Sequence, residues 1–220
     1  MSTDQALSQG AVPLDGAAGL SDVRERWPVE GSAELARSHI VALRTDQVRM
    51  PGGHLAERDV VEHTGAVAVV ALDEAGRVLM IRQYRHPVGA VLWEIPAGLR
   101  DVPGEPVAAT AERELLEEAG YRASDWRVLC DYFSSPGMTD ERLRVFLARG
   151  LTEVAPAERD FVPQDEEAQL ELAWVPLEQA VSGFLAGDLH NGAAAVGILS
   201  AYAARRDGFA GLRTTDAPEL

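Results

Sequence analysis

Short apolar segments alternate with turn residues through much of the chain, and this pattern predicts a β-rich protein. From residue 34 onward, Val, Leu and Ile alternate with polar positions, and clusters of Gly, Pro and Asp separate the segments. Asp73-Glu74-Ala75-Gly76 has the composition of a turn. The expected strands are residues 38–43, 46–50, 58–63, 66–72, 78–84, 92–95, 126–133, 142–148 and 170–175.

Helical patterns occur in three segments: residues 106–119, which end at Gly120, residues 177–186 and the alanine-rich residues 191–205. Together with the strands they predict an α/β fold, a mixed sheet flanked by helices. The expected divisions of the chain are a mobile tail at 1–33, N-terminal strands at 34–63, a catalytic domain at 64–205 and a C-terminal tail at 206–220.

Composition narrows the possible functions. The formal net charge is −15, which disfavours non-specific nucleic-acid binding, and all twenty basic residues are Arg. Mechanisms that need a phosphate-loop or Schiff-base lysine are therefore excluded, whereas Arg can still bind phosphate. The single Cys130 is interpreted as a buried structural thiol. The first residues lack a secretory signal and the apolar segments are too short to span a bilayer, so we expect a cytoplasmic protein.

Three acids lie on one face of the first predicted helix. Glu114, Glu117 and Glu118 are three or four positions apart, so their side chains are neighbours, and such like charges repel each other. A solvated helix face tolerates this arrangement. A divalent cation would compensate it directly, and carboxylate oxygens suit Mg²⁺ or Mn²⁺.

The residues around these acids decide between the two interpretations. Gly98, Glu105 and the run from Arg113 to Tyr121 together resemble the box of the Nudix hydrolase family. Residues 105–121 match the spacing of that box, while Gly98 and Glu105 are separated by six residues, one more than usual. The resemblance covers about residues 34–204 and implies an α/β/α sandwich and hydrolysis of a nucleoside diphosphate linked to another group.

Other segments resemble the ADP-ribose pyrophosphatase branch of that family. These are Gln83-Tyr84-Arg85, the run from Leu92 to Gly98, and Ser135-Pro136-Gly137 before Asp140-Glu141. The implied reaction is Mg²⁺-dependent hydrolysis of ADP-ribose to AMP and ribose 5-phosphate, with Mn²⁺ as a possible substitute. Two alternatives remain open: another nucleoside diphosphate derivative such as a nucleotide sugar, NADH or a dinucleoside polyphosphate, or an ADP-ribose-binding regulator without catalysis.

The resemblance also implies roles for individual residues. Glu114, Glu118 and the carbonyl of Ala97 would bind the metal, with Glu117 contributing, and Arg113 would orient one of these acids. The general base would come from a later acidic loop. There, Glu166 is the first choice and Glu167 its rival.

The resemblance also implies substrate-binding roles for residues outside the box, and each of them could instead serve only the fold. Arg85 contacts phosphate or ribose, or pairs with an acid; Glu94 lies near the substrate or forms a salt bridge. Pro136 marks the branch, or only shapes a turn. Related enzymes are homodimers that exchange N-terminal strands, which would allow Arg49 or Glu141 to serve the partner's site.

Overall fold

The computed structural model describes residues 20–158 and 170–220. Its strands are β1 (Val29–Arg37), β2 (Val41–Arg49), β3 (Leu55–His63), β4 (Ala66–Ala71), β5 (Arg77–Arg85), β6 (Ala90–Glu94), β7 (Ala97–Leu99), β8 (Tyr121–Phe133), β9 (Arg142–Glu153) and β10 (Glu171–Pro176). The α-helices are α1 (Val107–Ala119), α2 (Leu177–Ala186) and α3 (Gly192–Ala204). Short 3-10 helices are η1 (His86–Val88), η2 (Pro156–Glu158) and η4 (Arg205–Asp207).

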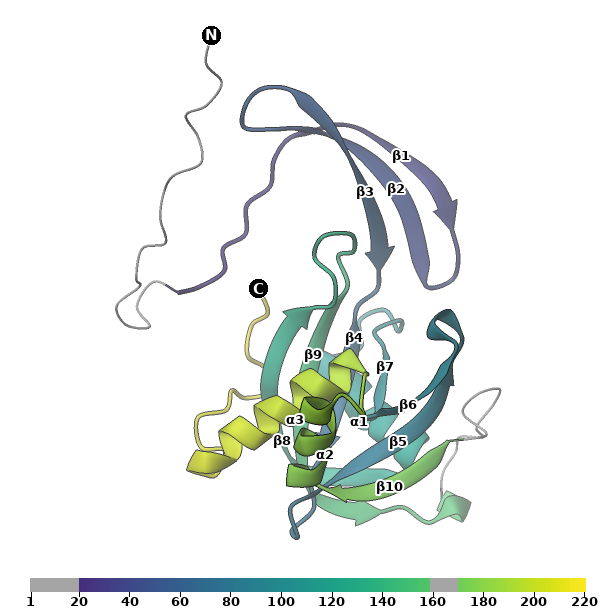
Figure 1. The fold of residues 1–220 in the computed structure, drawn as a ribbon, viewed down its shortest axis with the longest axis vertical. Coiled ribbons are helices and arrows are strands. Elements are labelled where there is room, and N and C mark those ends of the chain that lie inside the picture. Colours follow the sequence, from purple (N-terminus) through teal and green to yellow (C-terminus); the bar gives the residue numbers. More distant parts are fainter. Residues whose placement is uncertain (1–19, 159–169) are drawn as a thin grey trace.

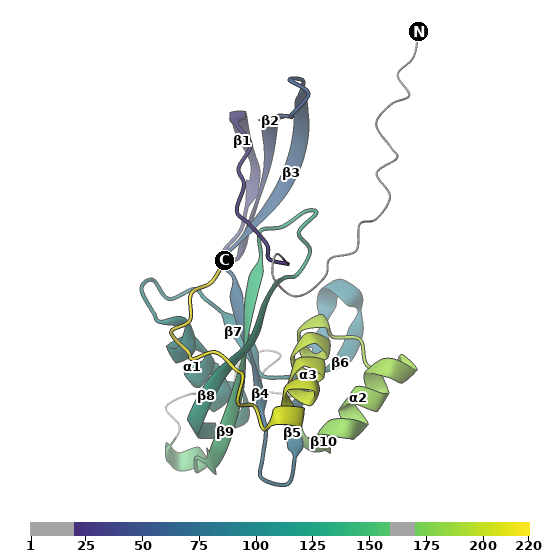
Figure 2. The same ribbon diagram turned by 90° about the vertical axis from the view of Figure 1, so that its left-hand side faces the viewer.

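The described strands form three sheets (Figure 1). One sheet has the order β7-β4-β9-β8 and is mixed, because β4 pairs with β9 in parallel while its other pairings are antiparallel. A second, antiparallel sheet has the order β10-β5-β6. The third consists of β1, β2 and β3 and extends away from the rest of the protein (Figures 1 and 2).

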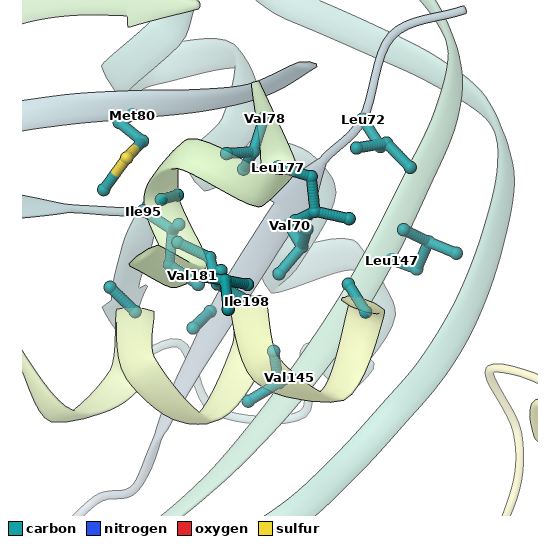
Figure 3. Packing of buried hydrophobic residues seen from close by; sticks show 14 of the residues in the cluster. Val70, Leu72, Val78, Met80, Ile95, Val145, Leu147, Leu177, Val181 and Ile198 are labelled. Carbon is teal, nitrogen blue, oxygen red and sulfur yellow. The ribbon is translucent and has the colours of Figure 1, made fainter. Parts of the chain in front are cut away.

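Helices cover both faces of the central strands, as the α/β/α sandwich requires (Figure 2). On one face, Ala111 and Leu115 of α1 pack with Val67, Val69 and Phe146, all of them buried. The opposite face belongs to α2 and α3. Figure 3 shows its buried cluster, whose labelled members are Val70, Leu72, Val78, Met80, Ile95, Val145, Leu147, Leu177, Val181 and Ile198. Because side chains alternate along β4, this strand contributes to the buried clusters on both faces of the sheet.

The N-terminal sheet touches the body of the protein through the loop between β8 and β9. The backbone N–H of Val61 donates to the carbonyl of Met138 at 2.8 Å, and the Thr139 hydroxyl donates to the carbonyl of Val61 at 2.8 Å. The backbone N–H of His63 donates to the Asp140 carboxylate at 2.9 Å. These bonds fix the point at which β3 leaves the body.

Several expected boundaries differ from the observed ones. β1 begins at Val29 rather than near residue 34, because its residues pair with β2 from Val48 onward. The two strands expected at 38–43 and 46–50 are one strand, β2, preceded by a turn in which Ser38 binds the backbone of Val41. Beyond the strand expected at 92–95, residues Ala97–Leu99 form the short strand β7, which pairs with β4.

The expected C-terminal tail, residues 206–220, packs in part against the body of the protein. Phe209 is only 8% exposed, and Arg149 lies over its ring at 4.9 Å from the centroid. Further along, the backbone N–H of Val128 in β8 donates to the carbonyl of Arg213 at 3.0 Å. Residues after 205 are therefore part of the packed structure.

Candidate active site

Arg113 of α1 lies at the centre of the predicted acid cluster. Its guanidinium donates to Glu114 at 2.7 Å, to Glu117 at 3.2 Å and to both oxygens of Glu105 at 3.3 Å. Glu105 also accepts a hydrogen bond from Thr110 at 2.9 Å, in the first turn of α1. One cation thus orients three carboxylates, and it is a single helix that brings most of them together.

The backbone of β7 forms the floor beneath these acids. The N–H of Ala97 donates to Glu118 at 2.8 Å. Gly98 lies against Glu114 so closely that a Cβ atom on Gly98 would be 1.9 Å from the Cδ atom of Glu114. Only a residue without a side chain leaves room for the Glu114 carboxylate in this position.

Glu114 is the most buried of the α1 acids. Burial raises the pKa of Glu114 to about 7, and the charge of Glu117 adds to this, although Arg113 opposes it. By contrast, hydrogen bonds from Arg113 and Thr110 lower the pKa of Glu105 despite partial burial. A buried carboxyl group with a raised pKa, beside other acids, is the arrangement that a nearby cation would stabilise in its charged form.

The donor set fits a hard divalent ion. It consists of carboxylate oxygens on α1 next to the backbone of β7, in a space that a Cβ atom at Gly98 would fill. Within residues 20–158 and 170–220, no three His, Cys, Asp or Glu side chains already form a set of metal ligands. In this structure the positive charge next to Glu114 and Glu117 is the guanidinium of Arg113. The assignment of Ala97, Glu114, Glu117 and Glu118 as ligands stays a prediction.

Arg85, the last residue of β5, forms an ion pair with Glu94, the last residue of β6. Arg85 Nε donates to Glu94 Oε1 at 2.9 Å and Arg85 Nη2 donates to Glu94 Oε2 at 2.7 Å, a bidentate pair. Glu94 is 2% exposed and lies three residues before Ala97. The structure therefore shows the salt-bridge alternative for both residues, and it leaves their contact with substrate a prediction.

Gln83 belongs to the segment that resembles the ADP-ribose pyrophosphatase branch, but sequence patterns assigned it no role of its own. It lies two residues before Arg85 on β5, so both side chains are on the same face of the strand. It is 8% exposed, and its Oε1 atom has no hydrogen-bond partner among the described residues. A buried carboxamide oxygen without a partner is costly, which favours a polar group bound from outside the chain.

Pro136 and Glu141 lie apart from the acids of α1. Both belong to the segment between β8 and β9 that contacts β3. Glu141 Oε1 is 3.6 Å from His63 Nδ1, and Pro136 lines a cleft of about 460 Å³ with Arg58 and Met138. The structure thus brings Ala97 and the box acids together but not these two residues.

The predicted bases Glu166 and Glu167 lie outside the described residues, so their position relative to the acids stays a prediction.

None of the helices in the described ranges is both long enough and apolar enough to cross a bilayer.

Comparison with known proteins bears directly on this geometry. A family model for the NUDIX domain matches residues 62–196, a range that contains the whole box and most of the two buried clusters. The chain belongs to the Nudix hydrolase family. Nudix hydrolases generally need a divalent metal ion, in keeping with the acid cluster on α1.

Individual Nudix relatives cover most of the chain. An ADP-ribose pyrophosphatase of Mycobacterium tuberculosis is 49% identical over 185 residues, which are 84% of this chain and 87% of that protein. One from Bacillus subtilis is 36% identical over 148 residues, 67% of this chain and 77% of that protein. A crystal structure of an ADP compounds hydrolase aligns with a TM-score of 0.69 and 21% identity, covering 86% of this chain and 99% of that one. The structural likeness supports the Nudix fold.

The extra residue in this Nudix box has a structural explanation. Asp101, Val102, Pro103 and Gly104 are all exposed, and Gly104 has a φ of +80°. The insertion is therefore accommodated in a solvent-exposed turn, where a positive φ suits glycine. Gly98 and Glu105 on either side keep their contacts with Glu114 and Arg113.

Proposed function

We propose that this Nudix hydrolase cleaves ADP-ribose with water to give AMP and ribose 5-phosphate, using Mg²⁺, with Mn²⁺ as a substitute. The observation that carries the proposal is the contact of Glu114 and Glu118 with the backbone at Ala97 and Gly98. The sequence relationship to two ADP-ribose pyrophosphatases supports the choice of substrate. A cytoplasmic location belongs to the same proposal.

In this proposal the box residues bind the metal. Glu114, Glu118 and the carbonyl of Ala97 would be ligands, with Glu117 contributing. When bound, a divalent ion would neutralise charge on the diphosphate and lower the pKa of a bound water molecule. Arg113 fixes the angle of the Glu114 and Glu117 carboxylates, because its planar guanidinium reaches both at 2.7 and 3.2 Å.

The remaining roles concern the substrate and the attacking water. Arg85 would contact the diphosphate, since its side chain is 41% exposed and Glu94 orients its guanidinium. Glu166 would accept the proton of the attacking water, with Glu167 as the rival. Pro136 would belong to the substrate site, and we assign Glu141 to the substrate site of a partner subunit, since it lies beside His63 at the end of β3.

A substrate panel tests the reaction. Purified protein with Mg²⁺ is offered ADP-ribose, a nucleotide sugar, NADH and a dinucleoside polyphosphate in oxygen-18 water. We expect ADP-ribose to be hydrolysed fastest, with the label in one of its two products. Faster turnover of another compound would reassign the substrate, and binding of ADP-ribose without turnover would indicate a regulator.

Variants test the residue roles. Glu114→Gln and Glu118→Gln should weaken metal binding and reduce turnover, with partial recovery at high Mg²⁺; an unchanged metal dependence would contradict the ligand assignment. Glu166→Gln should lower kcat while metal affinity stays the same. If Glu167→Gln has this effect instead, the base is the neighbouring residue.

A further inference from the structure

The C-terminal segment returns to the sheet on the side of α1. Arg144 Nη1 of β9 donates to the carbonyl of Ala217 at 2.8 Å. Thr215, Asp216 and Ala217 line a cavity of about 390 Å³ together with the first residues of α1. Figure 2 shows this segment, in yellow, passing along β8 toward α1. The chain end is thus placed next to the helix that carries the acid cluster.

Glu219 is the main polar anchor of this segment. Its carboxylate accepts from Arg100 Nη1 at 3.1 and 3.2 Å, and it lies 2.9 Å from Arg142 Nη2 and 3.7 Å from Arg144 Nε. The Glu219 side chain is 15% exposed and that of Arg144 3% exposed. Three guanidinium groups around one largely buried carboxylate make a strong, oriented contact.

These three arginines come from two separate places in the sheet. Arg142 and Arg144 belong to β9, whereas Arg100 follows β7, and β4 lies between the two strands. Neighbouring strands are about 4.8 Å apart, so Glu219 connects positions roughly 10 Å apart. Gly65, just before β4, leaves space for this crossing, since a Cβ atom there would be 3.6 Å from Arg100 Cδ and 3.1 Å from the carbonyl of Arg142.

Arg100 is also the near end of the loop that leads from β7 to α1. Its backbone N–H donates to the carbonyl of Gly65 at 3.1 Å, and it is two residues beyond Gly98. The following four residues are exposed, and the far end of the loop is held by Glu105 on Arg113. Loss of the contact between Arg100 and Glu219 would therefore release the half of the loop that is next to Gly98 and Glu114.

We propose that Glu219 is a positioning residue for this loop: by holding Arg100 against Arg142 and Arg144 of β9, it fixes the backbone at Ala97 and Gly98 beneath Glu114 and Glu118. The importance of Glu219 for metal binding rests on the proposed function. The effect of Glu219 on the order of the loop can be measured in the metal-free protein.

The test uses Glu219→Gln, Glu219→Asp, Arg100→Gln and the double variant of Glu219→Gln with Arg100→Gln. Asp216→Asn is the matched control, because it removes the same charge three residues away at an exposed position. In the metal-free protein we measure amide hydrogen exchange of residues 99–105. Calorimetric titration then gives Mn²⁺ affinity, and turnover of ADP-ribose is followed as a function of Mg²⁺.

For Glu219→Gln we expect exchange in residues 99–105 to be about 10-fold faster and Mn²⁺ binding about 10-fold weaker, as for loss of a group that orients metal ligands. The turnover lost should return at high Mg²⁺, which general destabilisation would not produce. Glu219→Asp should retain most of the wild-type behaviour, and the double variant should be no worse than Arg100→Gln alone. Arg100→Gln tests the same contact if Glu219→Gln fails to fold.

Wild-type loop exchange and Mn²⁺ affinity in Glu219→Gln would overturn the proposal, as would an equal loss in Asp216→Asn. The proposed function fails in a different way. A wild-type protein that binds Mn²⁺ but leaves ADP-ribose intact would refute that function, while the exchange and Mn²⁺ measurements would still decide the role of Glu219.

Discussion

At the scale of single residues, Gly98 is the described glycine at which an added Cβ atom would come closest to another atom. A Cβ atom there would be 1.9 Å from Glu114 Cδ and 2.2 Å from its Oε1. The obstructing atoms are the far end of a flexible side chain, so the carboxylate can move away while the fold persists. A side chain at position 98 would therefore displace the Glu114 carboxylate.

We therefore predict that Gly98→Ala lowers turnover by about 100-fold, the effect of a misplacement of about 1 Å. The free energy of unfolding should change by only about 1 kcal/mol. Steady-state kinetics and urea unfolding measure the two effects. Gly192→Ala is the control, because a Cβ atom at this first residue of α3 would meet nothing within 4 Å. Full activity in Gly98→Ala would contradict the prediction.

Gln83 gives a second prediction at this scale. Gln83→Met removes a buried oxygen that has no hydrogen-bond partner in the described structure, and it should stabilise the metal-free protein by about 1 kcal/mol. Turnover should fall if the carboxamide faces the substrate. Chemical unfolding and kinetics on the same sample measure both, with the exposed Gln47→Met as control. A destabilised Gln83→Met would show that the oxygen is satisfied in solution.

At the scale of elements, Asp131 connects β8 to β9 and to the C-terminal segment. Its carboxylate accepts from Arg144 at 2.6 and 3.0 Å and lies 3.0 Å from Arg213. Burial alone would raise the pKa of Asp131, but the hydrogen bonds and charges of Arg144 and Arg213 outweigh it and lower this pKa. The ionised form is therefore the one that stabilises the fold.

The sign of the pH dependence follows from that direction. Because the folded-state pKa is below the unfolded value near 3.8, the contribution is complete above pH 3.8 and is lost as the pH falls through the folded value. At pH 7, Asp131→Asn should cost about 3 kcal/mol, since it leaves the buried Arg144 without its main partner. Urea unfolding at pH 7 and near pH 3 should show the difference shrinking. A difference that is independent of pH would rule out this role.

Sequence patterns predicted elements whose information is local. The three acids of α1 are neighbours because of helical spacing alone, and α2 was predicted with its observed bounds, Leu177–Ala186. β7 was missed because it has three residues, one of them Gly98, and acquires strand geometry by pairing with β4. The contact of Arg100 with Glu219 joins residues that no periodicity relates, so only the folded structure could show it.

At the scale of the whole molecule, the N-terminal sheet presents large apolar side chains to solvent. Val29, Leu35, Ile40, Val41 and Leu55 are 38–60% exposed. Within the described chain, β1 is an open edge of this sheet, and the outer edge of β3 is bonded to the β8–β9 loop at Val61 and His63. An exposed apolar surface with an open strand edge favours association. We propose that it joins two copies of the chain in a homodimer.

This proposal predicts that Leu35→Glu converts a dimer into a monomer, because the added charge would have to be buried at the interface. Sedimentation velocity measures the mass of the particle. Leu185→Glu adds the same charge on α2, at a side chain that is 78% exposed, and should leave the mass unchanged. A monomeric wild-type protein would refute the proposal.

The parallel pairing of β4 with β9 has a consequence for biosynthesis. Ala66 pairs with Leu143, so the central pair of the sheet closes only after the intervening chain, including all of α1, has been made. Contacts between such distant segments form slowly, since a long loop must close first. A nascent chain that ends before Leu143 would carry every acid of the box and still lack the completed sheet on which α1 packs. Competence to bind metal should therefore arise late in synthesis.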